Sequence, residues 1–188
     1  MIRRIPAVAS VIVLMAVGVM LWLGFWQIDR MHQKEALLAR YAAAQADTAL
    51  VNFPRDTASA EASLYHRSRI VCLRVTGMSG KSGRNAAAEP GYAHSALCDE
   101  AGGGKAQVVL GWSNSPESPL WTGGAVSGTI APGPRLVADP PLAGLQANAR
   151  PDPADIANNH LAYAVQWFLF ALTALVIYGL ALRKRLRG

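Results

Sequence analysis

The chain has 188 residues, of which 52% are hydrophobic, a composition that allows one folded domain together with membrane segments. Its formal net charge is +6. The region between Gln27 and Asn159 contains twelve basic and all twelve acidic residues, with no basic stripe, and this balance excludes nucleic acid as a partner. Six basic residues at the two ends account for the whole excess: Arg3, Arg4, Arg183, Lys184, Arg185 and Arg187.

The first predicted element is an uncharged run over residues 5–26, which follows a short N-terminal segment, residues 1–4. About 20 helical residues cross the ~30 Å hydrocarbon core of a bilayer, so this run predicts a transmembrane helix. A cleaved signal peptide is the alternative, but the run is longer than a signal core and ends in Trp22, Phe25 and Trp26 instead of a small-residue cleavage site. An uncleaved anchor is therefore favoured.

The region after Trp26 predicts a helical extension and then a β-rich domain. Residues 27–46 keep a three- and four-residue spacing without Pro or Gly, which indicates that the helix continues. Strands are predicted at 64–77, 92–98, 107–112, 124–130 and 135–138, with loops at 79–90 and 139–157. Short strands without alternating helices predict a small antiparallel barrel or sandwich over residues 47–159.

A second uncharged run predicts a second transmembrane helix over residues 160–182, followed by a basic tail, residues 183–188. Because basic residues beside spanning helices stay in the cytoplasm, we expect both termini to be cytoplasmic and the central domain periplasmic. The first run begins almost at Met1 and leaves no room for a mitochondrial presequence, which favours a bacterial inner membrane. Small residues, which are also simply abundant in membrane helices, would let the two helices pack closely: Gly18, Gly24, Ala164, Ala171 and Ala174.

Motifs of the common enzyme classes are absent from the sequence. It contains no phosphate-binding loop, no nucleophile elbow and no zinc-protease motif, so we expect a protein that is not an enzyme. Its two cysteines, Cys72 and Cys98, are too far apart for a redox pair of the Cys-x-x-Cys kind. In an oxidising periplasm they would form a disulfide between strands, although two separate thiols remain an equal alternative.

Histidine is the other residue type that could carry chemistry. We expect His32, His66 and His94 to be solvated, because each lies among polar residues. His160 differs because it begins the second apolar run, and helical geometry places it on one face with Tyr163 and Trp167. This face is either an interfacial aromatic belt or a pocket in which the imidazole holds a haem iron.

Two motifs at the ends of the soluble region resemble the Surfeit locus protein 1 family. The segment Leu23-Gly24-Phe25-Trp26-Gln27-Ile28-Asp29-Arg30, with Lys34, resembles the L-G-x-W-Q-x-x-R-x-x-x-K motif that opens this family. The segment His160-Leu161-Ala162-Tyr163-Ala164-Val165-Gln166-Trp167-Phe168 resembles its H-x-x-Y-A-x-Q-W-F element. Weaker similarities between them, in the same order, are Tyr65-His66-Arg67, Arg74-Val75-Thr76-Gly77, Val108-Val109-Leu110-Gly111-Trp112 and Val126-Ser127-Gly128-Thr129-Ile130.

The resemblance implies an assembly factor for haem-copper cytochrome c oxidase that helps haem a reach the catalytic subunit, with haem a synthase as a further partner. It implies that His160 binds metal only through the haem iron. The resemblance and the composition together nominate the other residues of a haem site, with Arg30 and Lys34 for the propionates: Trp26, Gln27, Arg30, Lys34, Tyr163 and Trp167. The alternative is a membrane-anchored structural chaperone of the catalytic subunit that binds no haem.

Overall fold

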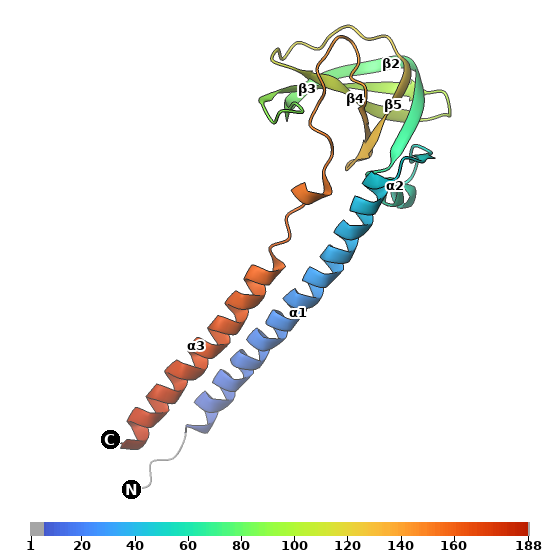
Figure 1. The fold of residues 1–188 in the computed structure, drawn as a ribbon. Coiled ribbons are helices and arrows are strands. Elements are labelled where there is room, and N and C mark those ends of the chain that lie inside the picture. The colour runs from blue at the N-terminus through green and yellow to red at the C-terminus, as the bar shows by residue number, and fades with distance from the viewer. Residues whose placement is uncertain (1–5, 188) are drawn as a thin grey trace. The chain divides into compact units, whose positions relative to one another are not determined.

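The computed structural model describes residues 6–187, and the chain divides into two compact units. One is a helix pair, formed by the chain up to Leu38 and from Ile156 onward, and the other is a β domain, residues 39–155 (Figure 1). Arg3, Arg4 and Ile5, which belong to the predicted N-terminal segment and the start of the first span, lie outside the described residues.

Among the described residues, six strands form the β domain, and four of them match their predicted positions closely. They are β1 Leu50–Val51, β2 Arg67–Arg84, β3 Pro90–Glu100, β4 Lys105–Ser113, β5 Gly124–Ala131 and β6 Arg135–Ala138. Five strands are neighbours in the order β2-β3-β4-β6-β5, and β5 pairs back to β2, which closes a barrel. The long β2 allows this closure because its first part, residues 67–72, pairs with β5, while residues 72–84 pair with β3.

The prediction of a purely antiparallel sheet is wrong, because the sheet is mixed. β4 runs parallel to β6, with Val108 opposite Leu136, and β1 runs parallel to β2. The reason is topological: β5 pairs with β2 instead of with β4, so the hairpin partner β6 fills the gap between β5 and β4 and must run along β4 in the same direction. This order of strands is the connectivity of the OB-fold, a small Greek-key barrel.

The predicted loop at residues 79–90 is also wrong, since β2 continues to Arg84 and β3 begins at Pro90. Glycines that suggested a loop are needed for close packing inside the sheet. A Cβ atom on Gly83 would lie 2.8 Å from the Cβ of Ala93, and one on Gly91 would lie 2.3 Å from Cζ2 of Trp112. Both distances are shorter than carbon atoms tolerate, so these glycines mark tight contacts between strands.

The barrel encloses the apolar core of the β domain, built from alternate residues of its strands. Its largest fully buried apolar side chains are Trp112, Leu110, Ile130, Leu136, Val108 and Val126. A disulfide joins Cys72 of β2 to Cys98 of β3, with Cα atoms 5.7 Å apart, and both residues are buried within this core. The core and the disulfide together hold the two longest strands in register.

The segment after β6, residues 139–155, passes over the barrel with little regular structure, apart from a short 3₁₀ helix at Pro153–Asp155. Isolated bridges tie it to the barrel, Trp112 with Gln146 and Asn85 with Asn148. Gly111 makes room for this segment, because a Cβ atom there would lie 2.4 Å from the Cβ of Leu145. The segment therefore covers the part of the barrel that the short β6 leaves open.

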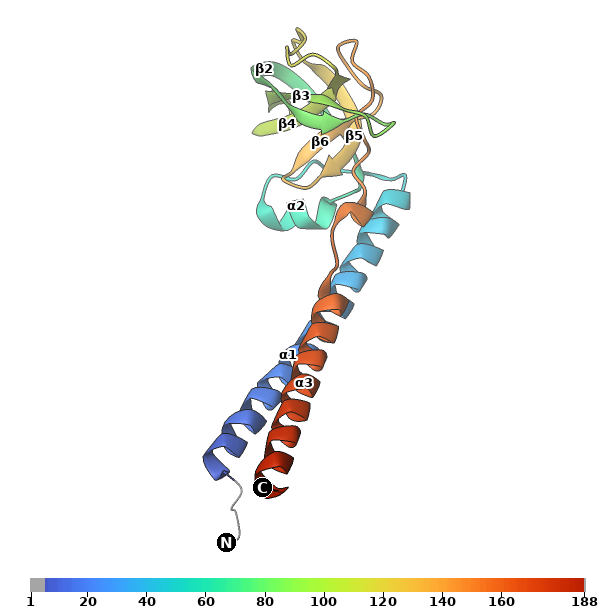
Figure 2. The same cartoon turned by 90° about the vertical axis from the view of Figure 1, so that its left-hand side faces the viewer.

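The short helix α2, Thr57–Ser63, lies at one end of the barrel (Figure 2). The last turns of α1 also belong to the β domain, where the Tyr41 ring packs against Tyr65 with centroids 4.9 Å apart. Gln45 adds a hydrogen bond from its Nε2 to the carbonyl oxygen of Pro151. Burial raises the pKa of Tyr65, as expected for a phenol removed from water.

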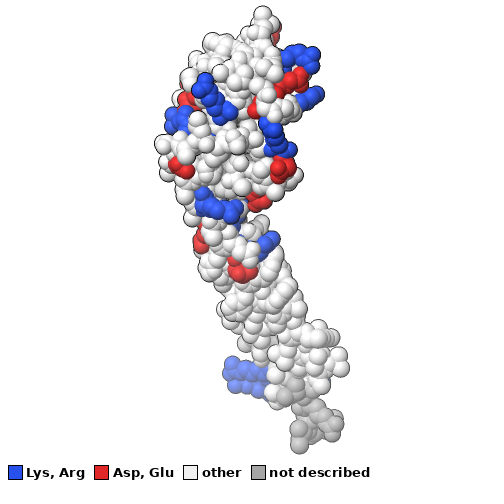
Figure 3. Space-filling view, turned by 90° about the vertical axis from the view of Figure 1, so that its right-hand side faces the viewer, with Lys and Arg blue, Asp and Glu red and all other residues white. Residues whose placement is uncertain are grey.

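The helix pair consists of α1, Ala7–Ala46, and α3, His160–Arg187, which run antiparallel side by side (Figures 1 and 2). Both are long and apolar enough to cross a membrane. In the most apolar 18-residue stretch of each helix, only 11% and 6% is buried in the protein, whereas the core helix of a soluble protein would be mostly buried. Figure 3 shows a long uncharged surface on this pair and basic side chains near the end of α3, where Lys184, Arg185 and Arg187 lie.

Candidate functional site

His160 and Gln27 meet where α3 begins beside α1. His160 is the first residue of α3, and its Nδ1 donates a hydrogen bond to Oε1 of Gln27, 2.7 Å away. Both side chains are partly buried. Within residues 6–187, Nε2 of His160 has no hydrogen-bond partner. The imidazole is thus held on one side and available on the other.

A seven-residue pattern explains why these two side chains come together. The less exposed residues of α1 recur at 10, 17, 24 and 31, and those of α3 at 164, 171 and 178, which is the spacing of a helix–helix seam. Small residues bring the two backbones close at this seam, since Ala164 and Ala171 are buried. Helix pairing, which the small residues alone left open, is thus present in the structure.

Gly24 sets the closest approach near the site. A Cβ atom at this position would lie 2.5 Å from Cε1 of Phe168, so the Phe168 ring occupies the space that a side chain would need. The same ring meets Phe25 edge-on, with centroids 5.3 Å apart. Gly18, the other glycine considered for pairing, faces away from α3, because nothing lies within 4 Å of its Cβ position. Glycine thus serves packing at one of these two positions.

Of the other predicted site residues on α1, Trp26 and Arg30 are exposed and lie together. The guanidinium of Arg30 stacks over the Trp26 ring, 5.8 Å from its centroid, and donates a hydrogen bond to Oε1 of Gln33 at 2.8 Å. Lys34 is partly buried and makes no hydrogen bond or ion pair with any residue from 6 to 187. Arg30 and Trp26 therefore form one group and His160 with Gln27 another.

The predicted aromatic walls on α3 differ in their surroundings. The Trp167 ring is partly buried and meets Phe170 edge-on at 6.1 Å between centroids. Tyr163 is 51% exposed and points away from the seam. Sequence reasoning missed Phe168 as a packing residue, although it lies one helical turn after Ala164 and therefore on the same face of α3 as the seam.

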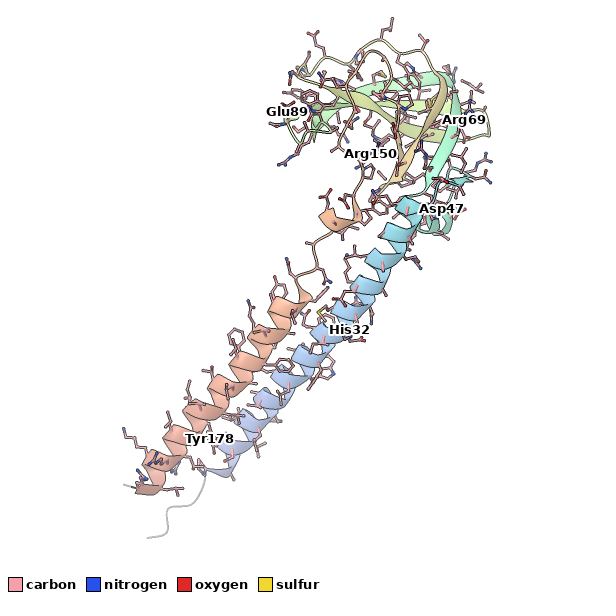
Figure 4. The ribbon with its side chains drawn as sticks, in the orientation of Figure 1. His32, Asp47, Arg69, Glu89, Arg150 and Tyr178 are labelled. Carbon is pink, nitrogen blue, oxygen red and sulfur yellow. A yellow bond between two sulfur atoms is a disulfide. The ribbon has the colours of Figure 1, made fainter. Side chains whose placement is uncertain are left out.

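A hydroxyl pair was also missed at the opposite end of the helix pair, where Tyr178 lies on α3 (Figure 4). Ser10 Oγ donates to the carbonyl oxygen of Pro6, 3.0 Å away, so the Tyr178 hydroxyl donates to Ser10 Oγ. Polar contacts of this kind fix the register of helices in apolar surroundings. The seam therefore has a polar contact at each end, with small and apolar residues between.

The two histidines of the β domain are both less exposed than the sequence suggested: His66 is partly buried, and its Nδ1 is inaccessible to solvent and has no hydrogen-bond partner among residues 6–187. The expectation that His94 is solvated is wrong, because this side chain is fully buried. Its Nε2 lies 2.8 Å from Oγ of Ser113 and its Nδ1 lies 3.4 Å from Oγ of Ser118, so neutral hydroxyls satisfy it. The neighbouring Gly80 leaves the space for the segment around Pro116 to cover the ring. No cluster of three or more metal-binding side chains occurs among residues 6–187.

Two hollows of about 410 and 550 Å³ lie on the β domain, and residues 53–56 line both of them. Both are lined by Arg55 and Glu100, whose charged groups are 4.0 Å apart. None of the residues predicted for a haem site lines either hollow. The candidate site therefore rests on the helix pair.

A sequence profile of the SURF1 family matches residues 14–172, which include most of α1, the entire β domain and the first part of α3. The chain belongs to the SURF1 family. This confirms the resemblance that the two end motifs indicated. The SURF1 family is linked to cytochrome c oxidase assembly. A comparison with curated proteins found no match.

Proposed function

We propose that this protein is a haem a carrier that serves the assembly of haem-copper cytochrome c oxidase. The observation that supports it most is the His160 side chain, which Gln27 holds through Nδ1 while Nε2 has no partner among the described residues. A neutral imidazole with one free nitrogen is the usual proximal ligand of haem iron. The family's link to oxidase assembly supplies the acceptor, the catalytic subunit.

The residues predicted for a haem site, which lie on the two helices of the pair, fit haem in their chemistry. When bound, haem a would supply the iron that His160 ligates. Trp26, Tyr163 and Trp167 offer aromatic surface for an apolar macrocycle. Two cations, Arg30 and Lys34, are suited to propionates, since neither is paired with a carboxylate among residues 6–187.

The same proposal places the helix pair in a bacterial inner membrane, with both termini cytoplasmic and the β domain in the periplasm. The basic end of α3 favours this orientation because cytoplasmic flanks carry excess Lys and Arg. The disulfide between Cys72 and Cys98 supports it independently, since disulfides persist in the periplasm and are rare in the cytosol. The β domain then serves docking, with haem a synthase as the haem donor and the oxidase catalytic subunit as the acceptor, and it turns over no substrate.

Haem binding is tested by purifying the full chain from cells that also make haem a synthase, then recording its absorption spectrum and haem content. We expect bound haem in the wild type and at least a tenfold loss in His160→Ala. The matched control is His32→Ala, an exposed histidine of α1, which should keep wild-type haem content.

Equal haem content in His160→Ala and the wild type would exclude the ligand role. A wild-type protein that co-purifies with the catalytic subunit but holds no haem would instead identify a structural chaperone.

A further inference from the structure

We infer that Gln27 is a positioning residue that fixes the tautomer of His160, so that Nδ1 carries the hydrogen and Nε2 carries the lone pair. The effect of this tautomer on the binding of haem iron rests on the proposed function, whereas the tautomer itself is a property of the protein alone. Gln27 thereby acts through His160 and need not touch a cofactor, which differs from the direct contact that the sequence suggested.

The tautomer follows from the partner atom. Oε1 of Gln27 is an amide oxygen and can only accept, so Nδ1 of His160 must be the donor across the 2.7 Å contact. A histidine free in water prefers its hydrogen on Nε2. In the neutral imidazole, the hydrogen bond therefore reverses this ordinary preference, so that the hydrogen is on Nδ1 and the lone pair is on Nε2. Metal-binding histidines are commonly oriented in this way by an acceptor on the other ring nitrogen.

The close approach of the two helices near Gln27 and the lack of a competing polar partner within residues 6–187 both favour its contact with His160. Gln27 lies one turn beyond Gly24, whose missing side chain admits the Phe168 ring and brings α1 and α3 together. It is also separate from the exposed polar chain on α1, in which Gln33 donates to Asp29 and accepts from Arg30. Its amide therefore has His160 as its hydrogen-bond partner among the described residues.

Three variants separate the hydrogen bond from packing. Gln27→Leu removes the acceptor at similar size, and Gln27→Glu restores an acceptor. The matched control is Gln33→Leu, which removes an exposed amide from the same helix without touching His160.

The direct measurement is a long-range ¹H–¹⁵N correlation spectrum of the haem-free full chain, labelled with ¹⁵N-histidine in a lipid nanodisc at pH 8. The signals of His160 are identified by their absence in His160→Ala. We expect the Nδ1–H tautomer in the wild type, Gln27→Glu and Gln33→Leu, and mainly Nε2–H in Gln27→Leu. A wild-type His160 protonated on Nε2, or an unchanged pattern in Gln27→Leu, would overturn the inference.

Haem titration then tests the consequence for the ligand. Loss of an orienting partner weakens metal binding by about 10–100-fold, so we expect at least a tenfold weaker haem affinity in Gln27→Leu and rescue in Gln27→Glu. The two proposals fail in different ways. An Nδ1–H tautomer in a wild-type protein that binds no haem contradicts only the proposed function, whereas wild-type haem binding that survives in Gln27→Leu contradicts the positioning role.

Discussion

Asp56 caps α2 through its carboxylate, which accepts a hydrogen bond from the backbone amide of Ser59 at 2.8 Å. This bond holds the pKa of Asp56 below its ordinary value. Because the pKa is lower in the folded state, the stabilisation is complete above the ordinary value and is lost as the pH falls through the folded value.

We therefore expect Asp56→Ala to lower the melting temperature of the full chain by a few degrees at pH 7. The difference from the wild type should shrink as the pH falls from 5 to about 2. Asp56→Asn is the control, since its amide oxygen also caps but does not titrate. A difference that stays constant down to the lowest pH would contradict the role of the charged cap.

The disulfide between Cys72 and Cys98 joins strands within the core, where both residues are nearly inaccessible to solvent. We expect the double variant Cys72→Ala, Cys98→Ala to lower the free energy of unfolding by about 2–4 kcal/mol, measured by urea denaturation. A reductant added to the native protein should leave the bond intact, because the sulfur atoms are buried. A variant as stable as the wild type would show that the core holds these strands without the bond.

Single residues differ in how far the sequence predicts them. The position of His160 at the start of α3 follows from the apolar run behind it, but its partner Gln27 is 133 positions away and requires the helix pairing to be known. The prediction for His94 was wrong, because its polar neighbours in the sequence suggested that the side chain is exposed to solvent. Burial of this side chain depends on glycine in the neighbouring strand and on a loop crossing above it, which local pattern does not reveal.

At the scale of elements, the seam between α1 and α3 depends on Gly24. A leucine at this position would displace the Phe168 ring and separate the helices, whereas a leucine at Gly18 meets open space. The test joins Ser10→Cys to Tyr178→Cys with a short bismaleimide, because the native cysteines are bonded to each other and do not react.

We expect efficient cross-linking in the parent and in Gly18→Leu, and at least a fivefold lower yield in Gly24→Leu. Equal yields in the two leucine variants would contradict the seam. A loss of cross-linking in both leucine variants would mean that the contact between residues 10 and 178 does not depend on Gly24 in particular.

Elements with strong periodicity were predictable, but their pairing was not. The uncharged runs predicted the two long helices, and β-branched residues predicted the strands β4, β5 and β6. Glycine at positions 80, 83 and 91 misled the prediction at the β2–β3 hairpin, because glycine permits both turns and close strand contacts. Strand direction depends on which edges meet, so the parallel pairing of β4 with β6 required the three-dimensional structure.

For the whole molecule, the placement of charge is the most informative feature. All net charge lies at the chain ends, and the motifs that resemble the SURF1 family lie at the two sequence positions where the β domain joins the apolar helices. The helix pair brings two of these motif residues, Gln27 and His160, into contact. The β domain, with its neutral balance of charges and disulfide-bonded core, is suited to a docking role under the proposed function.

The most direct test of haem a delivery is the ratio of haem a to catalytic subunit in oxidase purified from cells that lack this protein. We predict that the wild-type chain restores the full ratio, whereas His160→Ala, present in the membrane at the same level, leaves the catalytic subunit deficient in haem a. Full restoration of the ratio by His160→Ala would contradict haem delivery through this histidine.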